Sequence, residues 1–524
     1  MADDTYQARV FHDLTKYYAL SDAEGDERIG IGDPATRTAA IWQKDWDIKP
    51  FLYKVYETAP PIALTRELPE TGIPALEALS RTGAEAAGAT PPGRDLLARL
   101  GLLTNGSLER TWRTQDGRVH HYRTAGGTGA QYHLELYFVC ADLPDLDAGV
   151  YHYSALDHSL RLLRAGDHRA ALVEATGEAP SVAAAPVVLV MTSTFWRNAW
   201  RYRERAYRHA YWDAGTSLSH ILAIAASADQ PTELVLGYAD GQVNDLLGVD
   251  GTRESAVALV AIGRTGPTPP ALPALDPVEL PTRRLSPAEV VFHAITDMHL
   301  ASCLRTGEDA AAWRSPRWRR PAPEPTGELV ELRPTEQLDP RVVEQIILRR
   351  RSTRNYDTDV AIPFEAFSTL LHRSTRGVAS DVLTPGAPLT DLYLIVHAVE
   401  GLAPGIYLHH PARNAVELLR EGSFRAQAAR IAAQQRYAGD AHVNLYHLAH
   451  LPSLLTRYGD RGYRLAQLEG ALHAGKLHLG THTMGLGAVG STSYDDEVIE
   501  FFSPHAAGKD YMFVTVFGKR RPRR

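Results

Sequence analysis

The amino-acid sequence predicts an α+β fold built from two tandem copies of one domain. The chain has 524 residues, more than one hydrophobic core usually supports, so two domains of roughly 200 to 250 residues are expected. Segments of the first half reappear in the second half, and in each half strand-like and helix-like stretches alternate. These three observations favour a duplicated domain over one large domain.

The duplication is visible in long matching segments. AGVYHYSALDHSLRLLRAGDHRAA in the first half aligns with PGIYLHHPARNAVELLREGSFRAQ in the second, and RYRERAYR aligns with RYGDRGYR. The aligned pairs are Gly149 with Gly405, Tyr151 with Tyr407 and Arg201 with Arg457 at an offset of 256, and Gly263 with Gly518 at an offset of 255. One register, with a shift of a single residue, therefore holds from the first pair to the last, which chance does not explain.

Each copy is expected to contain the same elements in the same order: a strand, a β-turn, a helix, a second strand, a long helix and a last strand. The expected strands are HLELYFVCA, VVLVMTSTF and SAVALVAIG in the first copy, and DLYLIVHAV, VNLYHLAHL and YMFVTVFG in the second. The expected β-turns contain GVYHY and GIYLHH.

Proline-rich stretches that begin at Arg264 and Arg314 separate the copies and bracket a short predicted helix around 288–304. The expected organisation is therefore an N-terminal arm over 1–69, a first domain over 70–264, a linker over 265–335 and a second domain over 336–524.

The overall composition excludes several classes of protein. The formal net charge of -7 argues against a general nucleic-acid binder. The two cysteines, Cys140 and Cys303, are too few for a disulfide framework. The N-terminus MADDTYQARV lacks the basic and apolar regions of a secretory signal, and apolar runs are shorter than the roughly 18 residues of a membrane span. A cytoplasmic protein that does not bind membranes is expected.

The second copy opens with the basic motif IILRRRSTRNYD. Arg350, Ser352 and Arg354 could supply the guanidinium forks and the hydroxyl that bind a phosphate dianion. A solvated basic helix end is the alternative for this motif taken alone.

Two further motifs follow at the end of the chain, GLGAVGSTSYDD over 485–496 and the terminal FGKRRPRR. The first fits the dinucleotide pattern G-x-G-x-x-G, but the stretch before it has a helical period instead of a strand, so a Rossmann fold is not expected. The second ends in basic residues, and a disordered tail that touches an acidic leader peptide is the alternative to phosphate binding.

Together these three motifs resemble those of the nitroreductase superfamily, in the same order. The resemblance implies FMN as the cofactor, bound through its phosphate and ribityl chain by the first motif and by the end of the last strand, with the flavin ring beside the glycine loop. The implied residues are Arg350, Arg351, Ser352, Arg354, Gly485, Gly487, Ala488, Val489, Gly490, Lys519 and Arg521.

The first copy is similar to the SagB-type branch of that superfamily, through FHDLTKY, KPFLYKVYETAPPIALTRELP, RTAGGTGAQYHLELY and the RYxxRxYR segment. This resemblance implies an azoline oxidase that converts azolines to thiazoles or oxazoles in a ribosomal peptide natural product. It also implies a modified precursor peptide and a cyclodehydratase as partners. Dioxygen is the expected reoxidant. Alternatives are another FMN-dependent dehydrogenation, a nitroreductase-type reduction, and a flavin-free scaffold that binds the precursor peptide.

Two departures from the SagB pattern affect the expected site. The family's Lys-Tyr pair is replaced by Arg201 and Tyr202, the expected catalytic residues, and because Arg stays protonated the base would be Tyr202, a water or the substrate's own acidity. The family's P-S-x-G-A loop is replaced by a loop that contains Gly127 and Thr128, expected to contact FMN, with Thr128 supplying the hydroxyl.

The two copies are expected to form an intrachain pseudo-dimer, with further homo-oligomerisation left open. The first copy has no RRSxR motif, so one FMN per chain is expected at the interface between the copies, opposite a degenerate mirror site. Histidines such as His447 and His473 lack metal-site spacing, so no metal is expected.

Overall fold

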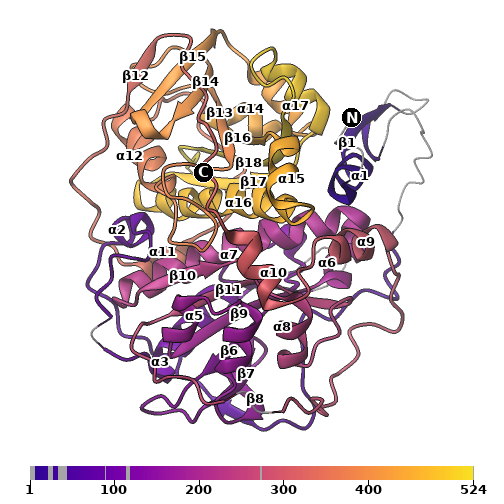
Figure 1. Cartoon of the computed structure of the whole chain (residues 1–524). Helices are drawn as coiled ribbons and strands as arrows, with labels where there is room; N and C mark the ends of the chain where they lie inside the picture. The colour runs from indigo at the N-terminus through magenta and orange to yellow at the C-terminus, as the bar shows by residue number, and fades with distance from the viewer. Residues whose placement is uncertain are drawn as a thin grey trace.

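The computed structural model describes residues 6–21, 27–32, 44–88, 90–113, 119–271 and 274–522. Two domains lie one above the other, each built around a seven-stranded antiparallel sheet with helices packed on it (Figure 1). Among the described residues, no helix has both the length and the apolarity needed to cross a bilayer.

The two sheets have the same order of corresponding strands when the second sheet is read from its other edge. The first sheet is ordered β10(Thr232–Val235), β11(Glu254–Ile262), β9(Val187–Thr194), β6(Leu134–Cys140), β7(Gly149–Ser154), β8(Ser159–Ala165) and β3(Pro61–Ala63). The second is ordered β12(Leu329–Glu331), β15(Ala415–Glu421), β14(Gly405–His410), β13(Thr390–Val396), β16(Val443–Ala449), β18(Asp510–Gly518) and β17(Gly487–Ser491). Two hairpins lie outside these sheets, β1(Tyr17–Ser21) with β2(Glu27–Ile31) and β4(Ser107–Arg113) with β5(Val119–Arg123).

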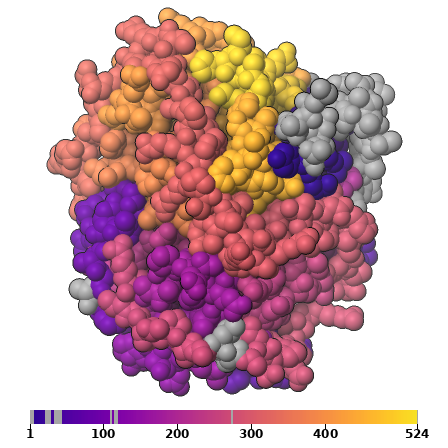
Figure 2. Space-filling model, in the orientation of Figure 1, coloured from indigo at the N-terminus to yellow at the C-terminus, as the bar shows by residue number. Residues whose placement is uncertain are grey.

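Helices cover the sheets and connect the domains. They are α1(Gln7–Leu14), α2(Ala75–Ser80), α3(Arg94–Asn105), α4(Arg169–Ala175), α5(Pro180–Ala184), α6(Phe195–Tyr202), α7(Ala206–Ser227), α8(Asp240–Leu247), α9(His293–Ala301), α10(Gly307–Arg314), α11(Val343–Arg349), α12(Phe364–Ser374), α13(Arg425–Ile431), α14(Arg436–Asp440), α15(Leu451–Tyr458), α16(Arg461–Thr483) and α17(Asp495–Phe502). The segment between the domains crosses the front of the molecule and lies against both of them (Figure 2).

Two sequence expectations were wrong in detail. The expected β-turns GVYHY and GIYLHH are strands β7 and β14, since their aromatic and branched side chains are buried, and each pairs with the strand that follows it. The expected glycine loop is mostly the edge strand β17, which pairs with β18. Gly487 suits this strand because a Cβ there would lie 2.1 Å from Thr353 Oγ1.

Helices α7 and α16 hold the domains together. Small residues allow their close approach: a Cβ built on Gly215 would lie 2.4 Å from the Leu468 carbonyl oxygen, and one on Gly475 would lie 2.4 Å from Ser219 Oγ. Both helices contribute to one buried apolar cluster that crosses the interface. The copies therefore share a core and pack as an intrachain pseudo-dimer.

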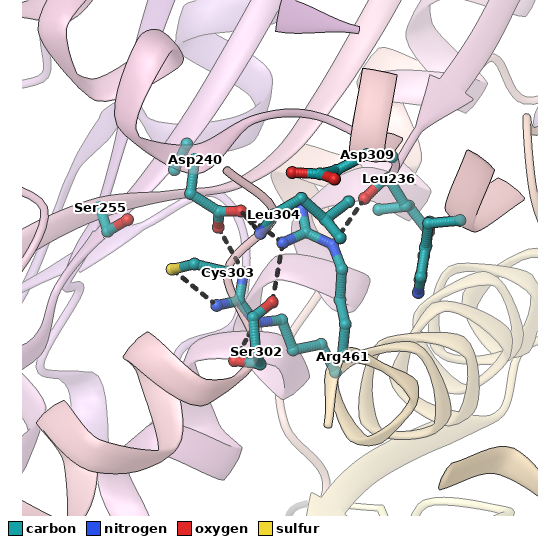
Figure 3. A network of polar contacts seen from close by, with 12 residues as sticks. Leu236, Asp240, Ser255, Ser302, Cys303, Leu304, Asp309 and Arg461 are labelled. Carbon is teal, nitrogen blue, oxygen red and sulfur yellow. Dashed lines mark hydrogen bonds and ion pairs between the residues drawn. The ribbon is translucent and has the colours of Figure 1, made fainter. Parts of the chain in front are cut away.

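Two equivalent ion-pair networks cross this interface. Arg205 and Arg208 of the first domain donate to the Asp495 carboxylate of the second at 3.0 and 2.5 Å. Arg461 of the second donates to Asp240 of the first at 2.5 Å (Figure 3), and Arg464 donates to the same carboxylate at 2.6 Å. All six side chains are at most 4% exposed. The arrangement repeats because each domain supplies an Arg-x-x-Arg pair to the other's aspartate.

The same networks reveal a counterpart of the N-terminal arm. Arg208 Nε donates to Oγ1 of Thr15, which directly follows α1, and Arg208 Nη2 donates to the carbonyl of His12, which lies within α1. Arg464 makes the same two bonds to Ser302 and His299, at the end of α9. Helix α9, inside the expected linker, thus occupies the place that α1 has in the other half.

Candidate functional site

A cavity of about 340 Å³ lies at the domain interface. It is lined from the first domain by Tyr17, Gly126, Gly127, Thr128, Gly129, Arg201, Tyr202, His209, Trp212, Asp213 and Thr216. From the second domain it is lined by Arg350, Ser352, Arg354, Gln435, Tyr437, His478, Val489, Gly490, Ser491, Thr492 and Phe513. Neither domain alone could form this cavity.

One side of the cavity is basic. Arg350, directly after α11, is 6% exposed and its guanidinium donates to the Thr124 carbonyl of the first domain at 3.0 and 3.2 Å. Ser352 and Arg354 follow on an extended segment that is fixed by a bond from Thr353 N to the Ala488 carbonyl, 3.0 Å. Two guanidinium groups and a hydroxyl therefore line the cavity within five residues of chain.

The loop over 126–130 forms the facing wall. Asp213 fixes it by accepting bonds from Thr128 N at 2.8 Å and from Thr128 Oγ1 at 2.7 Å, while its other contact is His133 Nε2 at 2.8 Å. Gly129 has φ 61°, and a Cβ there would lie 2.3 Å from Tyr202 Oη. Glycine at this position therefore allows both the turn and the close approach of the tyrosine.

Tyr202 and Arg201 end helix α6 beside this loop. Burial raises the pKa of Tyr202 to about 12, so its phenol is neutral over the physiological range and is able to donate a hydrogen bond. Arg201 is exposed, with its guanidinium carbon 5.5 Å from the centre of the Tyr202 ring. The raised pKa disfavours Tyr202 as a general base and suits it to a hydrogen-bond donor or acid.

His209 is a cavity residue that the sequence interpretation missed. Its Nδ1 lies 2.7 Å from Asn198 Oδ1, and the amide nitrogen of Asn198 lies 3.4 Å from the Thr128 carbonyl. This chain of contacts places the proton on Nδ1 and leaves Nε2 as a hydrogen-bond acceptor. Burial and the nearby cations hold the pKa of His209 well below its usual value, so the ring is neutral.

An alignment of the two copies could have identified His209 from the sequence. At the offset of 256, Asn198 and His209 correspond to Leu454 and Leu465. A linked pair of polar residues thus stands in one copy where the other has two leucines.

Several expected site residues lie outside the cavity lining. Lys519 and Arg521 are exposed beyond β18, where Arg521 Nη2 lies 3.7 Å from Asp359 Oδ2. The Arg351 side chain is exposed, and its backbone N–H donates to His482 Nε2 at 3.2 Å. Gly485, Gly487 and Ala488 precede the part of β17 that lines the cavity, which consists of Val489, Gly490 and Ser491.

The lining residues fit FMN by their chemistry. Guanidinium groups and a hydroxyl suit a phosphate dianion. Trp212 and Phe513, whose ring centroids lie 5.1 Å apart, and the small residue Gly490 offer apolar surface to a flat ring. Arg350, Ser352 and Arg354 would hold the phosphate, and the strand segment from Val489 would lie by the ring.

The mirror position is filled by protein. Tyr458, which corresponds to Tyr202, lies beneath Trp313 and Trp318 at centroid distances of 5.3 and 6.1 Å. Arg457 donates to the carbonyls of Trp313 and Pro316. The sheet edge at β10 is covered too, because Leu234 N donates to the Ala379 carbonyl at 2.9 Å.

One cluster of metal-ligand types belongs to the interface networks instead. Single ligand atoms of Asp240, His299 and Cys303 lie within 4.8 Å of one another. Both Asp240 oxygens already accept bonds from guanidinium groups, as Figure 3 shows for Arg461. The carboxylate is therefore neutralised by arginine and serves the domain contact.

Comparison with known proteins agrees with this architecture. Residues 129–264, which contain Tyr202 and Asp213, match the model of the Nitroreductase family. A Methanocaldococcus jannaschii protein named as a nitroreductase is 25% identical over 143 residues, which are 27% of this chain and 71% of that protein. A crystal structure from Anabaena variabilis, also named as a nitroreductase, has a TM-score of 0.75 at 23% identity and covers 98% of this chain and 100% of its own. Residues 129–264 are thus similar to the Nitroreductase family, and the predicted nitroreductase-like fold in two tandem copies is confirmed.

Proposed function

We propose that this protein is an FMN-dependent dehydrogenase or oxidase with one flavin per chain. The observation that carries the proposal is the interdomain cavity, where the basic segment of the second domain and the Thr128 loop, Tyr202 and His209 of the first domain meet. The nitroreductase-family match over 129–264 supports the same class of chemistry.

The chain's own residues would bind and orient the reactants. Arg350, Ser352 and Arg354 would hold the phosphate, and FMN, when bound, would supply the two-electron redox chemistry. Tyr202, with its pKa raised to about 12, would donate a hydrogen bond to the substrate. Because its pKa is lowered, His209 would stay neutral and accept a hydrogen bond at Nε2 while Asn198 keeps its ring in that tautomer, and the proton that leaves the substrate carbon would pass to a water.

The substrate we propose is an azoline ring of a ribosomal peptide, which loses two electrons and two protons to become a thiazole or oxazole. The SagB-like segments of the first copy support this choice, and they also make a cyclodehydratase the expected partner. Another FMN-dependent dehydrogenation, such as Cα–Cβ desaturation, would need the same cavity residues and is the second candidate.

The purified protein tests the cofactor directly. We expect a flavin absorbance band and, after heat release, a ratio of flavin to protein near one. A ratio near two would contradict the filled mirror position, and a colourless chain that FMN cannot reconstitute would instead support a peptide-binding scaffold.

Turnover tests the reaction. We expect an azoline-containing peptide to lose about 2 Da while dioxygen is reduced to peroxide, since two hydrogens leave the ring. Consumption of NADH without peroxide would favour a nitroreductase-type reductase.

A further inference from the structure

A second cavity, of about 480 Å³, lies within the second domain. Its volume falls in the range of small-molecule sites, roughly 300 to 1,000 Å³. Residues of β13, β14 and β16, helix α16, the loop over 386–388 and the proline-rich segment 319–324 line it. Its side-chain walls include Pro321, Pro323, Pro388, Pro411, Thr390, His409, His447 and His473.

Three buried histidines face this second cavity. His409, His447 and His473 are 5%, 2% and 6% exposed, and they come from β14, β16 and α16. His447 Nδ1 lies 3.3 Å from Thr390 Oγ1. Within the described part of the chain, the rings of His409 and His473 have no hydrogen-bond partner, although both line the cavity. Buried polar groups are normally bonded, so these rings call for a ligand or for water.

In the first domain, side chains fill the position that is equivalent to the second cavity. At the offset of 256, the histidines of the two strands, His409 and His447, correspond to Tyr153 and Met191. Both lie in the main apolar cluster, and helix α3 packs on Tyr153 so closely that a Cβ on Gly101 would lie 2.4 Å from its ring. The duplication therefore gave a filled core in one domain and a histidine-lined cavity in the other.

The second cavity also lies close to the interdomain cavity. His447 pairs with Phe513 across β16 and β18, and Phe513 lines the interdomain cavity. Helix α16 crosses this pair at Gly470, whose built Cβ would lie 3.1 Å from His447 Cβ and 3.5 Å from Phe513 Cβ. The two cavities are thus separated by the helix crossing and one pair of strand residues.

We propose that the second cavity binds an uncharged heteroaromatic ring, with ring heteroatoms bonded to His409 and His473 and ring faces against the imidazoles and prolines. Burial lowers the pKa of His409 and of His447 to about 3 and lowers that of His473 too, so all three rings are neutral donors and acceptors. The nearby carboxylate of Asp391 is already paired with Arg320 and with Lys509. Charged lining residues lie at the exposed side of the cavity, where Arg319 is exposed and Arg413 Nη2 lies 3.1 Å from Glu324 Oε2, while the buried histidine wall offers uncharged hydrogen-bonding groups, which suits a neutral ring.

Benzothiazole is a suitable probe. Naphthalene, a fused bicyclic aromatic without heteroatoms, is the control compound. Saturation-transfer NMR and calorimetry on the full chain should show benzothiazole binding at least about tenfold more tightly than naphthalene. The double variant His409→Tyr/His447→Met places the first domain's residues in the cavity and should abolish binding. Tyr202→Phe, in the interdomain cavity, should leave benzothiazole binding unchanged.

The proposal is overturned if the wild-type chain does not bind benzothiazole, if naphthalene binds equally well, or if the double variant folds and still binds. Loss of binding in Tyr202→Phe would show that benzothiazole binds in the interdomain cavity, and this result would also overturn the proposal. Zn²⁺ that displaces benzothiazole with 1:1 stoichiometry would assign a metal site instead. If the double variant does not fold, the single variants His473→Ser and His409→Phe decide by the same measurement. None of these outcomes depends on flavin chemistry.

Discussion

The two sides of the domain interface share the same ion-pair network but differ in whether a cavity lies beside it. Both retain an Arg-x-x-Arg pair that donates to an aspartate of the other domain, Asp495 on one side and Asp240 on the other. On one side Tyr202 lines a cavity, and on the other Tyr458 is covered by Trp313 and Trp318. The ion pairs that join the domains therefore occur on both sides, while the interdomain cavity lies on the Tyr202 side.

Two chain segments account for this difference. The end of α10 carries Trp313 and the segment after it carries Trp318, and both are fixed by Arg457, so they cover the mirror tyrosine. The stretch over 379–381 pairs with β10, the edge strand that corresponds to β17. At the cavity, β17 instead faces the basic segment through the bond from Thr353 N to the Ala488 carbonyl. Filling an unused site in this way buries apolar surface and removes an exposed sheet edge.

The largest expected effect is on the free energy of unfolding, and it tests whether the two ion-pair networks of the interface contribute equally to it. Asp240→Ala and Asp495→Ala each leave two buried guanidinium groups unpaired, which should lower the free energy of unfolding by about 3 to 5 kcal/mol. Urea unfolding measures both, and Asp359→Ala, at an exposed carboxylate, should change it by less than about 0.5 kcal/mol. A large loss on one side only would show that the networks are not equivalent.

Replacement of each of the two tyrosines by phenylalanine, in separate variants, tests whether catalysis is confined to one side of the domain interface. Tyr202→Phe should lower turnover by about 10²-fold or more while FMN stays bound, because the variant lacks the hydroxyl that is proposed to donate a hydrogen bond to the reacting substrate. Tyr458→Phe, beneath the tryptophans, should leave turnover unchanged. Equal effects of the two variants on turnover, or no effect of Tyr202→Phe, would remove Tyr202 from the reaction.

Removal of one cation from the basic segment tests the phosphate site. Arg350→Ala and Arg354→Ala should each weaken FMN binding by about 1.5 to 3 kcal/mol, since each removes a charge-assisted bond. The neighbouring exposed Arg349→Ala is the control. Flavin fluorescence after dialysis measures retention, with unfolding followed in parallel because Arg350 also bonds to Thr124 across the interface. Full occupancy in both variants would refute the assignment.

Acid titration sharpens the comparison at the Asp240 side. Arg461 and Arg464 outweigh burial and lower the pKa of Asp240 from 3.8 to about 2. The folded pKa lies below the unfolded one, so this stabilisation is present above pH 3.8 and is lost as the pH falls toward 2, by about 2 kcal/mol. The wild-type chain should therefore lose more stability than Asp240→Asn over this range. Parallel pH profiles would contradict the lowered pKa.

Much of the architecture was determined by the sequence itself. The repeat at an offset of 256 predicts two α+β domains, and the long helical period before Gly485 predicts α16 and excludes a Rossmann motif. The basic motif predicts Arg350, Ser352 and Arg354 as neighbours, because residues within one short segment stay together in any fold. These are local patterns, which the backbone period translates directly into structure.

Only the tertiary structure decided which distant residues share the cavity. His209 reaches it because α7 packs beside α6 and Asn198 links its ring to the Thr128 loop, contacts that no local period encodes. The same packing leaves Lys519 and Arg521 exposed beyond β18 and turns the expected glycine loop into the edge strand β17. It also closes the mirror position with Trp313, a residue that the sequence places in a linker. Long-range contacts depend on how whole elements pack, and that information is spread over both copies of the domain.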